Sequence, residues 1–107
     1  MTDHPLDALF ATVSSRKGAD PGVSYTASLF AKGRARIAQK VGEEAVELAL
    51  AAVAEPEKIV SESADLLYHV LVLWADAGIS PDRVWGELAR RAGTSGLAEK
   101  AARGKKR

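Results

Sequence analysis

Residues 34–54, RARIAQKVGEEAVELALAAVA, carry the clearest structural pattern in the chain. Small and large apolar side chains recur there every three or four residues, at Ile37, Val41, Ala45, Leu48 and Ala52. This spacing lines them along one face of an α-helix. The stretch therefore predicts a long amphipathic helix, which must bury its apolar face against other elements.

The flanking sequence predicts further helices joined by short connections. Ser24 is suited to cap the start of a helix, Gly33 to break one, and Gly78 to end one. The expected helices span residues 6–16, 25–32, 34–54, 57–77 and 81–93, with a further short helix after residue 95. Residues 23–26, VSYT, also contain the β-branched side chains of a short strand, and this alternative stays open at the level of sequence.

These elements predict an all-α fold, a bundle of about five helices in one domain covering residues 1–107, with a disordered tail from about residue 103. Residues 64–75, ADLLYHVLVLWA, are apolar around most of the circumference of the predicted helix. A helix of this kind is buried on several sides, and a chain with only two long helices cannot easily cover it alone. We therefore expect a homodimer with a helical interface to complete the bundle.

Composition narrows the possible partners. The chain has 107 residues, no cysteine, and 15 basic against 14 acidic residues, for a formal net charge of +1. A dedicated nucleic-acid-binding protein usually has a clear basic excess, so no nucleic-acid partner is expected. No apolar run reaches the roughly 20 residues that a membrane helix needs, and residues 1–9 lack the core of a signal peptide. The expectation is a cytoplasmic protein without a membrane partner.

Clustered acids are the strongest functional signal. The segment GEEAVE at residues 42–47 is followed by the pair Glu62 and Asp65. At about 100° per residue, Glu44 falls inside the apolar stripe of its helix, Glu47 lies at the edge of that stripe, and Glu43 lies further out. A solvated helix face usually mixes charges, whereas these pairs are acid with acid. A buried carboxylate without a partner must take up a proton or bind a cation.

The turn expected near Glu55-Pro56 brings the two acid pairs to the same height. Glu47 lies nine residues before Pro56, and Asp65 lies nine residues after it. On antiparallel helices with a rise of about 1.5 Å per residue, the pairs then face each other. Four carboxylates offering only oxygen suit a hard cation such as Mg²⁺ or Mn²⁺. The predicted metal ligands are Glu44, Glu47, Glu62 and Asp65, and the competing interpretation is a solvated acidic face.

The segments that carry these acids resemble a known family. The pattern Glu44-x-x-Glu47 and Glu62-x-x-Asp65, with Glu43 ahead of it, is similar to the signature of the all-α nucleotide pyrophosphatase superfamily, which includes the MazG-type enzymes and the dimeric dUTPases. The flanking segments resemble, more narrowly, the phosphoribosyl-ATP pyrophosphatase family over roughly residues 6–97. These segments are SYTASLFAKG (24–33), IAQKVGEEAVE (37–47) and ADLLYH (64–69).

The resemblance implies an enzyme of histidine biosynthesis that hydrolyses phosphoribosyl-ATP to phosphoribosyl-AMP and pyrophosphate. It implies Mg²⁺ as cofactor, with Mn²⁺ as an alternative, and a catalytic set made of Glu43, Glu44 and Glu47. Glu43 is expected either to be an outer ligand or to help activate water, and the alternative is an ordinary solvated acid.

A polyphosphate substrate also requires cations from the protein. Lys40, one turn before the acids, is the first candidate, and the basic residues around the Gly33 break come next. His69, one turn beyond Asp65, is expected to contact phosphate or orient a carboxylate, unless it only packs. The expected substrate-binding residues are Lys40, Lys32, Arg34, Arg36, Ser24, Tyr25, Thr26 and His69. Ser24, Tyr25 and Thr26 equally suit a helix cap, and the arginines a solvated surface.

Two other functions fit parts of this pattern. A house-cleaning pyrophosphatase of the MazG type, acting on non-standard nucleoside triphosphates, has the same four acids. A non-catalytic helical module that binds a basic partner through an acidic stripe predicts no metal binding. Nucleic-acid binding through the tail is weak, because residues 103–107 supply only four charges and no aromatic side chain.

Overall fold

All regular elements in the part of the chain that the structure describes, residues 4–92 of a computed structural model, are helices. The elements are α1 (Pro5–Ser15), α2 (Tyr25–Lys32), α3 (Arg34–Ala54), the short 3-10 helix η1 (Pro56–Lys58), α4 (Ile59–Ala77) and α5 (Pro81–Ala92). The predicted all-α class and the five helices are confirmed. The short helix expected after residue 95 and the tail from about residue 103 lie outside the described residues.

Local sequence signals set the junction between α2 and α3. The Ser24 side chain accepts a hydrogen bond of 3.0 Å from the backbone N–H of Ala27, so Ser24 caps α2 and the strand alternative for residues 23–26 is wrong. Gly33 separates the two helices with φ +96° and ψ 171°, a backbone conformation that is essentially restricted to glycine. The direction of α3 relative to α2 therefore depends on this glycine.

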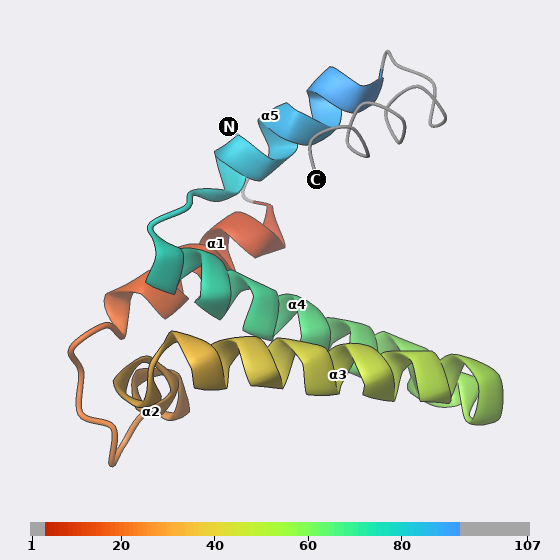
Figure 1. The fold of residues 1–107 in the computed structure, drawn as a ribbon, viewed down its shortest axis with the longest axis horizontal. Helices are drawn as coiled ribbons and strands as arrows, with labels where there is room; N and C mark the ends of the chain where they lie inside the picture. Colours follow the sequence, from red (N-terminus) through yellow and green to blue (C-terminus); the bar gives the residue numbers. More distant parts are fainter. Residues whose placement is uncertain (1–3, 93–107) are drawn as a thin grey trace.

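Helices α3 and α4 form an antiparallel hairpin, and each makes its most extensive contacts with the other (Figure 1). Helix α4 starts at Ile59, two residues later than predicted, because residues 56–58 form a tight 3-10 turn in which the Lys58 N–H donates to the Glu55 carbonyl. Gly78 ends α4 with φ +73°, as its position predicts. The short connection keeps the facing sides of the two helices in register.

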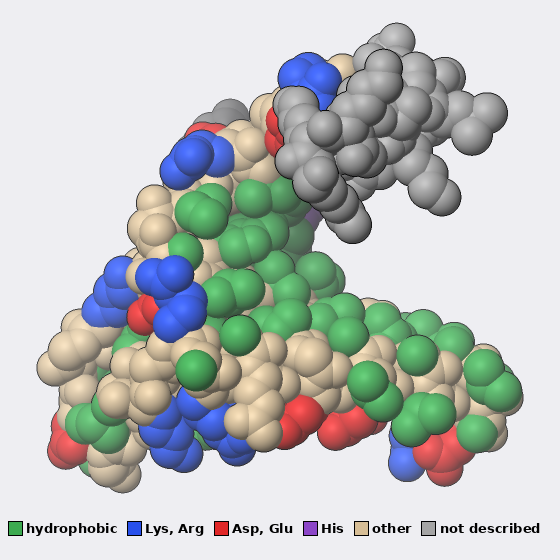
Figure 2. Space-filling model, viewed as in Figure 1, with side chains coloured by type: hydrophobic (Ala, Val, Ile, Leu, Met, Phe, Trp, Pro, Cys, Tyr) green, Lys and Arg blue, Asp and Glu red, His purple; other side chains and the backbone are tan. Residues whose placement is uncertain are grey.

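The core lies at one end of this hairpin. Helices α1 and α2 pack there against the start of α3 and the end of α4. The buried apolar side chains of this cluster are Val13, Leu29, Ile37, Val72 and Ala75. The other end of the hairpin extends beyond α1 and α2 as an arm, and hydrophobic side chains are exposed along it (Figure 2).

Helix α5 projects away from the arm (Figure 1). It contacts α4 through Trp85, whose ring lies edge-on to Trp74 with centroids 5.8 Å apart. Among residues 4–92, no helix combines the length and the apolar character that crossing a membrane requires.

Candidate active site

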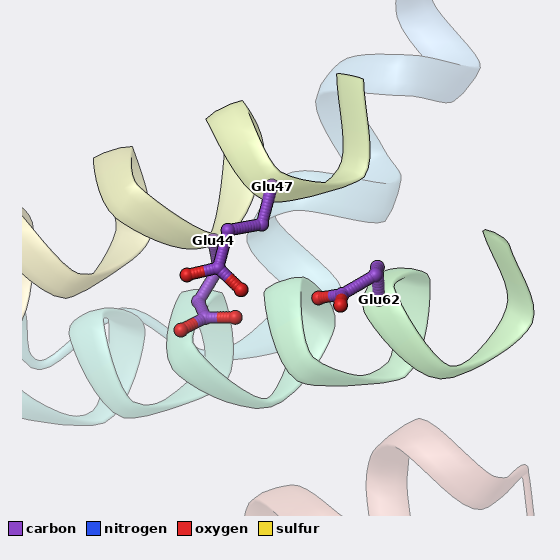
Figure 3. Close-up of side chains that lie close together, drawn as sticks. All are labelled: Glu44, Glu47 and Glu62. Atoms are coloured by element: carbon purple, nitrogen blue, oxygen red, sulfur yellow. The ribbon is translucent and has the colours of Figure 1, made fainter. Parts of the chain in front are cut away.

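Three of the four predicted metal ligands come together between α3 and α4. Glu44 and Glu47 extend from α3, and Glu62 extends towards them from α4 (Figure 3). One carboxylate oxygen of each lies within 4.8 Å of the other two. The i,i+3 spacing places the first two on one face of α3, and the short turn brings the third alongside. We call Glu44, Glu47 and Glu62 the acid group.

Asp65, the fourth predicted ligand, does not join the acid group in the described structure. It lies one turn after Glu62 on α4 and its side chain is exposed. Its charge nevertheless contributes to the electrostatic field at Glu62. Its backbone carbonyl accepts a hydrogen bond from His69. Asp65 is thus a neighbour of the acid group.

Glu62 has the least favourable environment of the acid group. Burial raises the pKa of its carboxyl above the ordinary value, and the nearby charges of Glu47, Asp65 and Glu44 raise it further. One oxygen, Oε1, is inaccessible to solvent and has no hydrogen-bond partner. Such a buried oxygen is unfavourable unless a proton or a cation compensates it. A set of carboxylate oxygens alone fits a hard divalent cation, so these residues are suited to Mg²⁺.

Lys40 supplies the positive charge nearest to the acid group. Its ammonium nitrogen lies 3.5 Å from Oε2 of Glu44, which is only 7% exposed, and 3.3 Å from Oε1 of Glu43. The hydrogen bond to Glu43 raises the pKa of Lys40 above its ordinary value, against the opposing effect of burial. Lys40 thus carries its charge between the acid group and Glu43, the carboxylate that precedes Glu44 on α3.

Glu43 faces away from the acid group and towards the preceding turn of α3. Its carboxylate accepts hydrogen bonds from Gln39 at 3.0 Å and from Lys40 at 3.3 Å, and the Arg36 guanidinium lies 3.8 Å away. The Lys40 hydrogen bond holds the pKa of Glu43 below its ordinary value, and burial partly opposes this. The sequence indicated Lys40 and Arg36, whereas Gln39 was missed because a neutral amide carries no charge signal.

A polar network joins α2 to α4 beside Asp65. The buried His69 ring contacts the Asp65 carbonyl through Nδ1 at 2.8 Å and the Tyr25 hydroxyl through Nε2 at 3.3 Å. Because a carbonyl oxygen only accepts, Nδ1 carries a proton, and in the neutral ring Nε2 accepts from Tyr25. The residues next to Tyr25 and His69, Thr26 and Tyr68, are hydrogen-bonded to each other through their hydroxyls. His69 therefore orients Tyr25 from a packed position.

The remaining predicted basic residues lie in different surroundings. Arg34, at the start of α3, donates a 2.6 Å hydrogen bond to the carboxylate of Asp76 near the end of α4. This ion pair therefore links the start of α3 to the end of α4. Lys32 is exposed in the last turn of α2. Of the four predicted cations, Lys40 and Arg36 are those that form ion pairs with the acids of residues 43–47.

Two hollows border the acid group, and Glu47 lines both. An open groove of about 540 Å³ runs along α3. Its lining residues are Gln39, Gly42, Glu43, Val46 and Glu47. A smaller pocket of about 290 Å³ lies towards the turn, and both Glu47 and Glu62 contribute to its wall. Within the acid group, Glu47 therefore borders both hollows and Glu62 borders the smaller one.

Comparison with known proteins agrees with this architecture. A family model described as phosphoribosyl-ATP pyrophosphohydrolase matches residues 6–92. The chain is 64% identical over 101 residues to the phosphoribosyl-ATP pyrophosphatase of Rhodospirillum rubrum, covering 94% of this chain and 86% of that protein. It is 61% identical over 102 residues to the protein of that name from Paramagnetospirillum magneticum, covering 94% of each.

A third relative, the phosphoribosyl-ATP pyrophosphatase of Azospirillum brasilense, is 65% identical over 99 residues, covering 92% of this chain and 89% of that protein. The matched region spans all five described helices and every predicted site residue. The similarity is therefore not confined to a short motif. The chain belongs to the phosphoribosyl-ATP pyrophosphohydrolase family.

Proposed function

We propose that this protein hydrolyses phosphoribosyl-ATP to phosphoribosyl-AMP and pyrophosphate as a step of histidine biosynthesis, with Mg²⁺ as cofactor and Mn²⁺ as a substitute. The observation that carries the proposal is the acid group, which lies within the region matched by the family. Glu44, Glu47 and Glu62 hold the metal, and Asp65 completes the set. The names of the relatives support the substrate.

The reaction adds water to the α phosphorus and breaks the bond between that phosphorus and the oxygen that bridges to the β phosphorus. A bound divalent cation would neutralise the phosphates and lower the pKa of a coordinated water. The protein must hold the reacting groups together and stabilise the charge on the departing pyrophosphate. Lys40 is placed for that second task because it pairs with Glu44 of the acid group, and Arg36 lies one turn before Lys40 on α3 and pairs with Glu43.

In this proposal, α2 and its cap orient the substrate. Tyr25 is exposed, and its only hydroxyl proton is directed at His69 when that ring is neutral. Its oxygen therefore accepts a hydrogen bond from a substrate hydroxyl. Thr26 is paired with Tyr68 and Ser24 caps the helix, so these two support the position of α2.

The direct test is pyrophosphate release from phosphoribosyl-ATP, measured with Mg²⁺ and with a chelator. Glu44→Gln keeps the shape of the buried side chain but removes its charge, so we expect kcat/KM to fall by about 100-fold or more. The matched control is Glu57→Gln, an exposed glutamate in the turn of the same hairpin, which retains activity. Full turnover by Glu44→Gln, or in chelator, contradicts the site.

Two measurements distinguish the alternative functions from the proposed one. Turnover of deoxynucleoside triphosphates at rates above those for phosphoribosyl-ATP would favour the house-cleaning alternative. A non-catalytic interaction module predicts no heat of binding when Mg²⁺ is titrated into the protein. The family match supports the enzyme over that module.

A homodimer is part of the proposal. The arm exposes apolar side chains of both long helices, including Leu50 and Val53 on α3 and Val60 and Leu67 on α4. Contiguous exposed apolar surface of this kind usually marks an interface. A second copy that offers the same arm would bury these side chains in a four-helix arrangement.

A further inference from the structure

Glu43 is the centre of a network of donors on the outer face of α3. Gln39 and Lys40 donate to its two carboxylate oxygens at 3.0 and 3.3 Å, and Arg36 forms an ion pair with it at 3.8 Å. Positions 36, 39, 40 and 43 follow the i, i+3, i+4, i+7 spacing of one helical face. One carboxylate thus fixes the orientation of three long side chains.

This network adjoins the acid group but is separate from it. The Glu43 side chain is 42% exposed and is not one of the three carboxylates whose oxygens cluster, whereas the adjacent Glu44 is buried against α4. Lys40 connects the two, since it pairs with both glutamates. The open groove along α3 is lined by both Glu43 and Glu47. A ligand that bound at the acid group and entered this groove would pass the network.

Arg36, Lys40 and Glu43 together carry a net charge of +1, which suits an anion. Lys40 also pairs with Glu44 of the acid group, whose charge the proposed divalent cation would balance. A lysine ammonium has three donors and an arginine guanidinium has five, so both keep donors that Glu43 does not occupy. The Arg36–Glu43 pair is partly exposed and adds little to stability, whereas the Lys40 side chain is only 18% exposed. The effect of the network is to immobilise two side chains that otherwise sample many rotamers.

We infer that Glu43 is a positioning residue that holds Lys40 and Arg36 as a clamp for the pyrophosphate portion of the nucleotide, beside the acid group. The inference rests on the proposed function and revises the expectation that Glu43 is a metal ligand or activates water. Removing the carboxylate leaves the cations in place but releases their side chains. The nucleotide then binds with a larger loss of side-chain entropy.

The test uses the whole protein and two probes, phosphoribosyl-ATP in kinetics and magnesium pyrophosphate in calorimetry. For Glu43→Gln we expect KM and the Kd of magnesium pyrophosphate to rise on the order of tenfold, the scale typical of outer supporting residues. We expect kcat and the affinity for Mg²⁺ alone to stay unchanged. A fall in kcat at constant KM, or a loss of Mg²⁺ affinity, overturns the inference, since either makes Glu43 part of the reacting centre.

A double-mutant cycle separates positioning from a purely structural effect. If Glu43 acts through Arg36 and Lys40, then adding Glu43→Gln to the Arg36→Met/Lys40→Met variant changes pyrophosphate binding by less than about twofold. Independent, multiplicative losses overturn the inference. The matched control is Glu87→Gln, which breaks a comparable network in which Glu87 pairs with Arg90 and Arg91 on α5, and which leaves KM unchanged. Far-ultraviolet circular dichroism checks the fold of each variant.

Failure of the proposed function gives a different result. If the unmodified protein does not hydrolyse phosphoribosyl-ATP, the kinetic arm is lost for every variant alike. The calorimetric arm still compares magnesium pyrophosphate binding by the unmodified protein with binding by Glu43→Gln. An equal Kd for the two overturns the clamp, and a weaker Kd for the variant supports it.

Discussion

At the scale of single residues, the site depends on a carboxylate placed where a helix normally buries an apolar side chain. Glu44 shares the inner face of α3 with Ile37 and Ala51, both of which are buried. Lys40 lies 3.5 Å away and offsets its charge, and the proposed cation, shared with Glu47 and Glu62, would offset it further. Lys40 thus offsets part of the cost of burying the Glu44 carboxylate.

Glu62 predicts a pH dependence of stability in the absence of metal. Its folded-state pKa is raised by burial and by Glu47, Asp65 and Glu44, so the folded protein holds this proton more tightly than the unfolded chain. The resulting stabilisation is present below the unfolded value of about 4.3 and is lost as pH rises through the raised pKa. Urea unfolding in chelator should show this loss, and Glu62→Gln should remove it.

Two controls accompany that measurement. Glu57→Gln, an exposed change in the same hairpin, should keep the pH profile of the unmodified protein. Saturating Mg²⁺ should reduce the loss, because the ion favours the charged carboxylate. The prediction is wrong if the unmodified protein and Glu62→Gln have the same profile from pH 4 to 7 in chelator.

Sequence periodicity is sufficient to identify Glu44 but not the whole site. The angular position of Glu44 on an amphipathic helix predicts burial, and the structure confirms it. Helical periodicity does not fix the side-chain rotamer of Asp65, and in the structure Asp65 does not join the acid group. The ion pair of Arg34 with Asp76 was not predicted, because the two residues are distant in sequence and adjacent only in the folded hairpin.

At the scale of elements, the junction between α2 and α3 sets the positions of the basic residues Lys32 and Arg34 on either side of Gly33. Gly33 adopts φ +96° and ψ 171°, and no atom lies within 4 Å of the position that a Cβ would take. A side chain at this position is therefore opposed by backbone conformation and not by crowding. The sequence predicted a break here because glycine commonly interrupts helices, and it also predicted the Ser24 cap one element earlier.

Replacing Gly33 with alanine should destabilise the protein by about 1–3 kcal/mol, the usual cost of a non-glycine residue in this region of backbone space. Chemical unfolding of the purified variant measures the change. Gly42→Ala, inside α3, is the control and should be neutral or slightly stabilising, since alanine favours a helix and no atom lies within 4 Å of the added Cβ. Equal stabilities for Gly33→Ala and the unmodified protein would contradict the strain argument.

The turn at residues 56–58 is the element whose conformation the sequence predicted least accurately. Residues 56–58 were expected to begin a continuous helix from Glu57, and they form a 3-10 turn instead. The cause is geometric, because Pro56 supplies no N–H and the chain must reverse within a few residues. The approach of Glu62 to Glu44 and Glu47 agrees with the predicted hairpin, but Asp65, which was expected at the height of Glu47, does not join them.

At the scale of the whole molecule, the hairpin arm is only partly covered. The core gathers at one end, under α1 and α2, and the apolar side chains of the arm remain exposed (Figure 2). The apolar circumference of residues 64–75 predicted that a second copy is needed to cover this helix. In the structure the chain itself buries Leu71, Val72 and Ala75, and Leu67 stays 45% exposed.

The proposed homodimer makes a prediction for Leu50, which is 63% exposed on α3. Leu50→Glu places like charges at a symmetric interface, so we expect dissociation to shift to at least tenfold higher protein concentration. Sedimentation velocity over a concentration series measures it. Leu88→Glu, at a position 55% exposed on α5, is the matched control and should leave association unchanged. A monomeric unmodified protein at micromolar concentration would exclude the dimer.

The acid group lies within a single helical hairpin, and this arrangement has a consequence for folding. Glu44, Glu47 and Glu62 are separated only by the end of α3, one turn and the start of α4. Folds rich in such local contacts have low contact order and reach the native state quickly. Because all three acids belong to this hairpin, the charge repulsion among them arises whenever the hairpin closes, whether or not the N-terminal helices have docked. Magnesium present during refolding should therefore change the refolding rate as well as the final stability.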